Sequence, residues 1–271
     1  MVLPRLVAQE TPAALLVNHG EPLRAPFDCA ESELQAVGLL CTEDEPCPIY
    51  LELNGIAPAG RKLFLAGDLH ATSGTVSSIL LASDDSGATW REAGAHIQGA
   101  SLDQIQFYDL DHGWAAGETQ YPLSRDPFFM ITRDGGTTWR QRPVTDEGGP
   151  GSVHRFWFDS AQHGELIVDA GRKAPGGRYA AYESETGGDN WMARSTTDEP
   201  PKIKRAPPSF ENADFRIRPA RNGKTYLIER RLGEKWETIA SFLIEAANCK
   251  IKPPALDVTP DVKEPEPAKE D

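Results

Sequence analysis

The chain has 271 residues and a formal net charge of −13 at pH 7. An acidic body argues against nucleic acid as the general partner, because neutralising phosphates requires a basic face. No apolar run approaches the roughly 18 residues needed to span a bilayer, so no transmembrane segment is expected.

Composition favours one all-β domain with little helix. Glycine (24) and proline (22) are abundant, and β-branched and aromatic residues recur in short runs. No long stretch keeps apolar residues at the i, i+3, i+4 and i+7 positions of an amphipathic helix. A short helix is expected only in ESELQAVGLL, residues 31–40.

Residues 1–46 are expected to form an extension that precedes the repeats and carries cysteines. The cysteines are Cys29, Cys41, Cys47 and Cys249, and four cysteines permit three pairings among which the sequence cannot choose. Three lie before the first repeat and one after the last, as expected if disulfides tie the extension to itself and to the end of the ring. Neither a CxxC pair nor suitably spaced histidines occur, so a zinc site at these cysteines is not expected.

The compartment is predicted from the same cysteines. Disulfides imply an oxidising environment, so we expect a periplasmic or secreted protein. The first 20 residues lack the apolar core of a signal peptide, although VAQETPA is similar to a chain just past a cleavage site. We therefore hypothesise that the given start is truncated or misplaced.

An eight-residue pattern recurs along the chain. It occurs as SDDSGATW (83–90, box 1), TRDGGTTW (132–139, box 2) and SETGGDNW (184–191, box 3), with a weaker copy in RRLGEKWE (230–237). The tryptophan spacings are 139−90=49, 191−139=52 and 236−191=45 residues. These spacings are typical of four-stranded propeller blades, which repeat about every 40 to 50 residues.

The boxes have a structural explanation as turns between the two outer strands of a blade. Their hydroxyl and carboxylate groups can bind backbone amides, glycine can adopt a positive φ, and the aromatic ring can cover the blade edge. The residues assigned to these structural roles are Ser83, Asp85, Gly87, Thr89 and Trp90 in box 1, Thr132, Asp134, Gly136, Thr138 and Trp139 in box 2, and Ser184, Gly188 and Trp191 in box 3.

Short apolar runs around the boxes predict an all-β propeller of about four to five four-stranded antiparallel blades within residues 47–252. The blades are expected at about 48–98, 101–147, 152–198 and 210–243. We expect a small ring, with an open arc completed by another copy as the alternative. Residues 253–271 are acidic and proline-rich, which predicts a disordered tail.

The pattern Ser/Thr-x-Asp-x-Gly-x-Thr-Trp resembles the Asp-box, or BNR repeat, of sialidases, sortilin-type receptors, xyloglucanases and photosystem II stability/assembly factor-like proteins. The last group is the most similar, because FYDLDHGWAAGE precedes ITRDGGTTWRQ as in that group's blade. The resemblance covers about 48–198 well and 210–243 weakly. Boxes 1 and 2 match fully, whereas Thr186 replaces the Asp and Asn190 the Thr in box 3.

This resemblance implies a non-catalytic, assembly-factor-like scaffold that binds a protein or peptide partner, without a cofactor. Residues 202–235 hold ten Lys and Arg against four acids, which could form a patch for an acidic partner. The candidate contacts are Arg216, Arg218, Arg221 and Lys224. A solvated face that offsets the acidic remainder is the alternative.

The alternative function is a glycan-active hydrolase similar to sialidases or xyloglucanases, or a carbohydrate-binding propeller. FRIRP (215–219) resembles the FRIP stretch of sialidases but follows box 3, whereas theirs precedes the first box. A xyloglucanase cleft requires two propellers, which 271 residues cannot build. If the chain is an enzyme, we expect a glycoside hydrolase, but no catalytic residue is assigned.

Two groups of side chains carry open alternatives. The acids Asp68, Asp109, Asp111, Glu118 and Asp159 could meet in a central channel or serve as turn acids. The histidines never form HxH or HExxH, so no metal site is expected. The aromatic residues Trp114, Phe156, Trp157 and Phe158 could form a recognition surface, but packing between blades is preferred, for Trp114 and at least one of the others.

Overall fold

A computed structural model describes residues 15–94, 96–120, 126–144, 151–204 and 214–250. The described chain is almost entirely β-structure in four antiparallel sheets, which confirms the predicted all-β propeller class. We name the sheets blades 1 to 4 in chain order. The predicted tail at 253–271 and the start of the predicted extension, residues 1–14, lie outside the described residues.

The strands follow the apolar runs of the sequence. Blade 1 holds β2 (Cys47–Ala59), β3 (Lys62–Ala71), β4 (Gly74–Ser83) and β5 (Thr89–Glu92), with β1 (Leu16–Val17) added beside β5 and β17 (Glu245–Cys249) beside β2. Blade 2 holds β6 (Ala100–Phe107), β7 (Gly113–Thr119), β8 (Asp126–Thr132) and β9 (Arg140–Pro143). Blade 3 holds β10 (Ser152–Phe158), β11 (Gly164–Asp169), β12 (Tyr179–Ser184) and β13 (Met192–Thr197), and blade 4 holds β14 (Phe215–Pro219), β15 (Thr225–Leu232) and β16 (Lys235–Leu243).

The described helix, α1 (Glu31–Ala36), lies inside the stretch where a short helix was predicted. Leu34 is its buried residue and anchors it to the core of blade 1. No helix in the described part of the chain has the length and apolar character that crossing a membrane requires.

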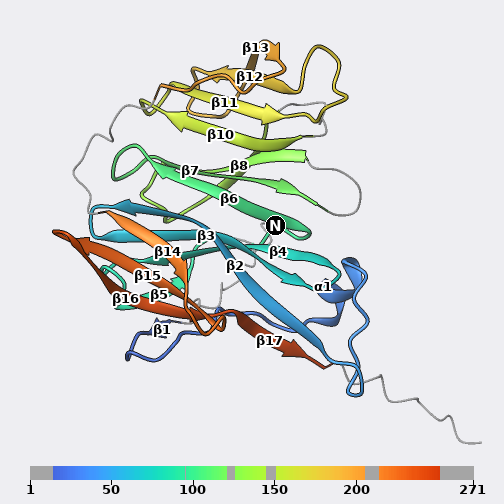
Figure 1. Ribbon diagram of the computed structural model, residues 1–271, viewed down its shortest axis with the longest axis vertical. Helices are drawn as coiled ribbons and strands as arrows, with labels where there is room; N and C mark the ends of the chain where they lie inside the picture. Colours follow the sequence, from blue (N-terminus) through green and yellow to red (C-terminus); the bar gives the residue numbers. More distant parts are fainter. Residues whose placement is uncertain (1–14, 95, 121–125, 145–150, 205–213, 251–271) are drawn as a thin grey trace, which may run out of the picture.

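The blades stack in the order 3, 2, 1, 4, with blades 3 and 4 at opposite ends (Figure 1). Strand β2 contacts β6 of blade 2 and also β14 of blade 4, so blade 1 lies inside the stack. The described blades therefore form an open arc, and the expectation of a closed ring is wrong for this part of the chain. Completion of the arc by another copy stays a prediction.

Strand burial gives the physical reason for the open arc. Strand β3 of the interior blade 1 is buried along most of its length, with Leu65 facing the core shared with blade 4 and Phe64 facing the core shared with blade 2. Strand β12, the third strand of the end blade 3, is buried only at its first and last residues, whereas the equivalent strand β8 of blade 2 is buried at every residue but the first. An interior blade needs two apolar faces, and blade 3 has only one.

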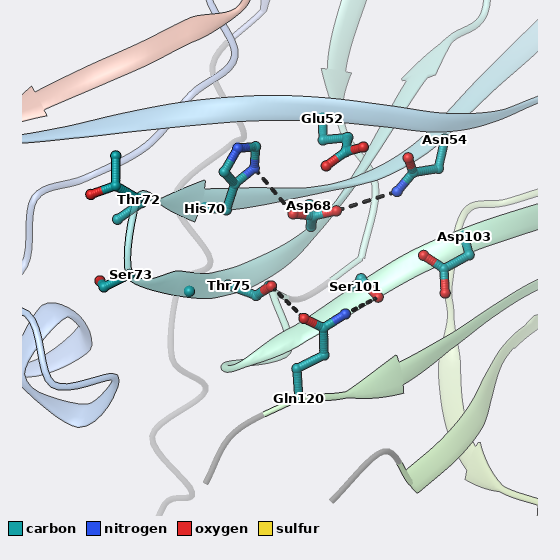
Figure 2. Close-up of a pocket in the computed structure, with 12 residues that line it drawn as sticks. Glu52, Asn54, Asp68, His70, Thr72, Ser73, Thr75, Ser101, Asp103 and Gln120 are labelled. Atoms are coloured by element: carbon teal, nitrogen blue, oxygen red, sulfur yellow. Dashed lines mark hydrogen bonds and ion pairs between the residues drawn. The ribbon is translucent and has the colours of Figure 1, made fainter. Parts of the chain in front are cut away.

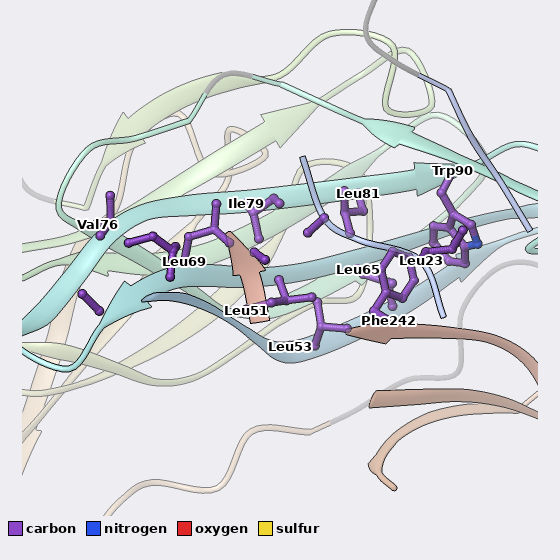
Figure 3. Close-up of a cluster of buried hydrophobic side chains, with 14 of the residues drawn as sticks. Leu23, Leu51, Leu53, Leu65, Leu69, Val76, Ile79, Leu81, Trp90 and Phe242 are labelled. Carbon is purple, nitrogen blue, oxygen red and sulfur yellow. The ribbon is translucent and has the colours of Figure 1, made fainter. Parts of the chain in front are cut away.

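The largest core lies between blades 1 and 4 (Figure 3). Leu51, Leu65 and Leu81 come from neighbouring strands of blade 1 and are fully buried. They share this core with Phe242 of blade 4 and with Trp90 of box 1. Burying an aliphatic side chain of this size stabilises the fold by about 1.5–3 kcal/mol, so this junction is a major source of stability.

The boxes form one recurrent hydrogen-bonded turn. In box 1 the Gly87 amide donates to Ser83 Oγ (2.8 Å), and the Thr89 amide donates to Asp85 Oδ1 (2.8 Å). Box 2 repeats both bonds with Thr132 and Asp134 as acceptors, and its two donors are the Gly136 and Thr138 amides (2.9 Å each). In box 3 the Gly188 amide donates to Ser184 Oγ (2.9 Å). The Asn190 amide donates to Thr186 Oγ1 (2.9 Å), so a hydroxyl replaces the carboxylate there.

Each box tryptophan packs against a ring of the neighbouring blade. The ring centroid of Trp139 in blade 2 lies 6.0 Å from that of Phe64 in blade 1, and Trp191 of blade 3 lies 5.1 Å from Phe129 of blade 2. Trp90 of blade 1 lies 5.4 Å from Phe242 of blade 4. The boxes therefore hold successive blades together and do more than cover a blade edge.

The N-terminal segment ties blade 1 to blade 4. Asn18 Nδ2 donates to the carbonyl oxygens of Gly87 in box 1 (3.2 Å) and Ile239 in blade 4 (2.6 Å). Leu23 exchanges backbone hydrogen bonds with β16, since its amide donates to Ser241 O and its carbonyl accepts from the Leu243 amide. The segment thus takes the place of an outermost strand beside β16.

Two disulfides complete this connection. Cys41 of the segment bonds to Cys47 at the start of β2, and Cys29 bonds to Cys249 at the end of β17, 220 residues away in sequence. This is the arrangement expected from the positions of the cysteines. A cross-link over so long a loop lowers the conformational entropy of the unfolded chain. The resulting stabilisation of the folded state is about 5 kcal/mol, at the upper end of the usual range.

Replacing Gly136 with alanine should destabilise the junction between blades 1 and 2. Gly136 has φ +80°, and a Cβ at this position would lie 2.3 Å from Phe64 Cε1. Gly223→Ala is the matched control, because Gly223 has φ +66° with open space around it. In urea unfolding we expect the control to lose about 1 kcal/mol through backbone strain alone. Gly136→Ala should lose about 1–3 kcal/mol more, and equal losses would contradict a close contact at the junction.

Candidate functional site

The second strands of blades 1 to 3 each carry an acid at the same position. These acids are Asp68 on β3, Glu118 on β7 and Asp169 on β11. Each is the last residue of a similar segment, LAGD, AAGE or LIVD. In each blade the first strand has a bulge beside this acid, and the bulged residues are Asn54, Asp103 and His154. A bulge redirects a side chain, so the repeat places two polar groups together in each blade.

Glycine permits the bulge in blades 1 and 2. A Cβ on Gly67 would lie 1.9 Å from the carbonyl oxygen of Glu52, and a Cβ on Gly117 would lie 1.9 Å from that of Ser101. No larger residue fits at either position without moving the first strand. Glycine before the acid is therefore a local requirement in blades 1 and 2, whereas blade 3 has its bulge opposite Val168.

A polar cavity of about 480 Å³ opens where blade 1 meets blade 2 (Figure 2). Strands β2 and β3 supply Glu52, Asn54, Asp68 and His70, whereas β6 and the residue after β7 supply Ser101, Asp103 and Gln120. The hairpin between β3 and β4 closes one side, where the Thr75 hydroxyl donates to Gln120 Oε1 (2.8 Å). The site thus depends on side chains from two blades.

Asp68 is the buried centre of the blade 1 side of this cavity, with only 5% of its surface exposed. Asn54 Nδ2 donates to Asp68 Oδ1 (3.2 Å), and His70 Nδ1 lies 3.4 Å from Asp68 Oδ2. The carboxylate of Asp68, and more weakly that of Glu52, holds the pKa of His70 above its ordinary value.

The cavity has a negative electrostatic potential. Burial raises the pKa of Asp103 to about 6, and the neighbouring carboxylate of Glu118 adds to this shift. Glu52 stands directly opposite Asp68 in the pairing of β2 with β3. Like charges in this arrangement destabilise a sheet.

The equivalent acid of blade 3 is neutralised differently. Arg178 donates to Asp169 through Nε and Nη2, at 3.0 and 2.6 Å from Oδ2. This contact holds the pKa of Asp169 below its ordinary value. Among the described residues, no lysine or arginine is paired with Glu52 or Asp68, so blade 1 has no counterpart of this guanidinium contact.

Four of the five acids singled out from the sequence divide into two groups. Asp68 and Glu118 are buried on second strands beside the acidic cavity. Asp109 accepts hydrogen bonds from the backbone amides of Asp111 (2.9 Å) and His112 (2.6 Å), and Asp159 Oδ1 lies 2.7 Å from His163 Nδ1. Asp68 therefore lines a cavity between two blades, and Asp109 and Asp159 serve turns, whereas the meeting of these acids in a central channel stays a prediction.

The sequence does not single out Glu52, Asn54 or Asp103, and His70 is among the histidines for which no metal site is expected. Asp68 and His70 form Asp-x-His on a strand, and this spacing places both side chains on one face. That pattern was available in the sequence. The contributions of Glu52 and Asp103 depend on strand pairing and on a one-residue bulge, which periodicity does not reveal.

The predicted basic contacts lie on blade 4 at the end of the arc. Arg216 Nε donates to Glu229 Oε2 (2.7 Å), and Arg218 Nη2 donates to Glu229 Oε1 (3.1 Å). The Arg216 guanidinium also lies 4.1 Å from the centre of the Trp236 ring. Arg221 and Lys224 are exposed in the turn between β14 and β15. The structure thus brings Arg216 and Arg218 together around Glu229, and Arg221 and Lys224 follow them in the next turn.

The predicted packing of aromatic residues between blades is confirmed for Trp114 and Phe158. Their rings stack with centroids 3.7 Å apart, and both side chains are buried. Trp114 Nε1 also donates to the carbonyl oxygen of Gly187 in box 3 (2.8 Å). These residues belong to the junction between blades 2 and 3, and not to an exposed recognition surface.

Comparison with known proteins gives weak structural similarity. No family model and no curated protein matches the chain. A solved structure titled "YCF48 bound to D1 peptide" is 17% identical, with a TM-score of 0.41 over 74% of this chain and 72% of that one. "YCF48 from Cyanidioschyzon merolae" is 19% identical, with a TM-score of 0.37 over 70% of this chain and 57% of that one. The fold stated above therefore rests on the sheets and contacts of this chain.

Replacing Asp103 with asparagine should stabilise the protein at pH 8. The folded pKa of about 6 lies above the ordinary 3.8, so stability falls as the pH rises from about 4 to 6 and the deprotonated carboxylate is disfavoured above that range. We expect a gain of about 1–2 kcal/mol at pH 8 in metal-free buffer, reduced by the access of water, and no gain near pH 4.

Asp109→Asn is the control for this measurement, since hydrogen bonds lower the pKa of Asp109 in the folded state. That variant should be destabilised at pH 8. Urea unfolding at both pH values provides the comparison, and a loss of stability at pH 8 in Asp103→Asn would contradict the negative potential of the cavity.

Proposed function

We propose that this protein is a non-catalytic propeller scaffold that binds an acidic protein or peptide segment on the outer face of blade 4. The observation that carries the proposal is the arrangement of Arg216 and Arg218 around one buried carboxylate, that of Glu229. Phe215 and Ile217 alternate with these arginines and pack against the core shared with blade 1. The arginines therefore lie on the face that points away from the stack.

The charges on this face do not cancel. The single carboxylate of Glu229 is shared by two guanidinium groups, and each arginine side chain remains about 40% exposed (42% and 41%). A guanidinium has five N–H donors in a rigid fork, so donors remain for a carboxylate of a partner. The low pKa of Glu229, caused by Arg218 and Arg216, shows that the cluster stays charged at neutral pH.

The arginines are also held in place before a partner arrives. Glu229 fixes both guanidinium groups, and Trp236 supports the one of Arg216 by a cation–π contact. Side chains that are already ordered lose less entropy on binding. Arginine and tryptophan are also the residues that most often dominate binding energy at interfaces.

The remaining surface supports an acidic partner at this end of the arc. The chain as a whole carries −13, whereas residues 214–235, which include β14 and β15 of blade 4, hold seven basic residues against three acids. Electrostatic complementarity steers an acidic segment to this region and repels it from the rest. At the opposite end, Arg178 pairs one to one with Asp169 and so offers no net charge.

We further propose that the three boxes are Asp-box repeats and that the role is assembly-factor-like. The recurrent hydrogen bonds of the boxes support the first point. The two disulfides support a periplasmic or secreted location, because disulfides persist in oxidising compartments.

Fluorescence anisotropy with labelled extended peptides tests the binding site. We expect acidic peptides to bind and matched peptides with Asn and Gln in place of the acids to bind at least ten-fold more weakly. Affinity for the acidic peptides should fall as salt rises, because exposed charges are screened. The double variant Arg216→Gln/Arg218→Gln should lose at least ten-fold in affinity.

Arg178→Gln is the control, since Arg178 is also ion-paired and lies over an aromatic ring, that of Tyr179. It should leave peptide affinity unchanged. Equal binding by the double variant and the wild type would remove blade 4 from the proposal. A glycan array with sialidase and glucanase assays tests the rival class, and glycan turnover by the purified chain would overturn the scaffold function.

A further inference from the structure

The blade 1 side of the acidic cavity holds three potential metal ligands from two neighbouring strands. Glu52 on β2 supplies a carboxylate oxygen, and Asp68 and His70 on β3 supply a carboxylate oxygen and an imidazole nitrogen. All three ligand atoms lie within 4.8 Å of one another. The side chains gather at the cavity (Figure 2), where solvent could supply further ligands.

The contact between His70 and Asp68 has the geometry of two ligands. His70 Nδ1 is inaccessible to solvent and has no hydrogen-bond partner among the described residues, although Asp68 Oδ2 lies only 3.4 Å away. Two ligands that each lie about 2.1 Å from one tetrahedral ion are about 3.4 Å apart. An ion between these atoms would satisfy both.

The balance of charge also favours a cation at this position. Glu52 and Asp68 face each other across paired strands, and the structure places no arginine or lysine against either in its described ranges. At the equivalent position of blade 3, Arg178 neutralises Asp169. The buried Glu229 of blade 4 is held by two arginines. In blade 1 the groups beside Asp68 are the imidazole of His70 and the carboxylate of Glu52, whereas blades 3 and 4 have guanidinium groups beside Asp169 and Glu229.

We propose that Glu52, Asp68 and His70 bind one divalent transition-metal ion of the zinc class. One imidazole nitrogen with two carboxylate oxygens suits such an ion, whereas calcium and magnesium prefer oxygen ligands alone. Asn54 donates to Asp68 Oδ1 and leaves Oδ2 for the ion, so it is a positioning residue that orients the carboxylate. The ion joins β2 to β3 beside the junction of blades 1 and 2.

The other candidate group, His163, Glu183 and Glu185 on blade 3, does not support the same proposal. His163 Nδ1 lies 2.7 Å from Asp159 Oδ1, and its Nε2 lies 3.0 Å from Glu183 Oε1. Arg194 also pairs with Glu183. These groups are already satisfied by one another, so the cluster is a suitable control.

The test is isothermal titration calorimetry of the full chain, first treated with a chelator, with zinc chloride. We expect saturation at one ion per chain, and we expect calcium and magnesium not to compete at equal concentration. His70→Gln and Glu52→Gln should each weaken zinc binding at least ten-fold, and Asn54→Ala should weaken it less. His163→Gln should leave it unchanged.

A second measurement locates the ion independently of the variants. Cadmium-113 NMR of the chain loaded with cadmium should give one resonance, typical of nitrogen and oxygen ligands, that is lost in Glu52→Gln. Zinc binding that survives both Glu52→Gln and His70→Gln, or that is lost in His163→Gln instead, would overturn the proposal. This site lies apart from the arginine face of blade 4, so its failure would leave the proposed peptide binding intact.

Discussion

At each described junction between blades, a box glycine lies in close contact with a side chain of the neighbouring blade. A Cβ on Gly136 would lie 2.3 Å from Phe64, and a Cβ on Gly188 would lie 3.2 Å from Ile131 of blade 2. Gly87 meets Ile239 at the junction of blades 1 and 4. All three glycines have positive φ, and in each box the tryptophan then covers the contact. The hydrogen bonds within the boxes fix this geometry.

The same constraint explains why one repeat is weak. A stack of four blades has three junctions, and the chain has three well-formed boxes, which join blade 1 to blade 4, blade 2 to blade 1 and blade 3 to blade 2. The fourth copy, RRLGEKWE, belongs to blade 4 and has no preceding blade to contact in the described arc. Its tryptophan, Trp236, instead supports Arg216 on the outer face. The fourth repeat therefore contributes to the charged outer face of blade 4 and not to a junction between blades.

The sequence predicted the blades because tryptophan spacing and turn residues are local properties. It left the open arc as the alternative to a ring, because blade order depends on contacts between residues far apart in the chain. The composition of the third strands was a usable indication, since YAAYES of blade 3 carries polar residues whereas FFMI in the third strand of blade 2 is apolar on both faces. The acidic cavity was only half predicted. A bulge of one residue decides which side chains face it, and shifting the register by one residue moves a side chain to the other face of the sheet.

A double-mutant cycle at one junction tests the central role of the boxes most directly. Trp191→Leu and Phe129→Leu are measured singly and together by urea unfolding, with Trp191→Leu and Phe64→Leu as the comparison pair from different junctions. The contact between Trp191 and Phe129 predicts a coupling energy of about 0.5–1.5 kcal/mol. The comparison pair should be additive within about 0.5 kcal/mol. Equal additivity in both pairs would contradict the conclusion that box tryptophans hold the blades together.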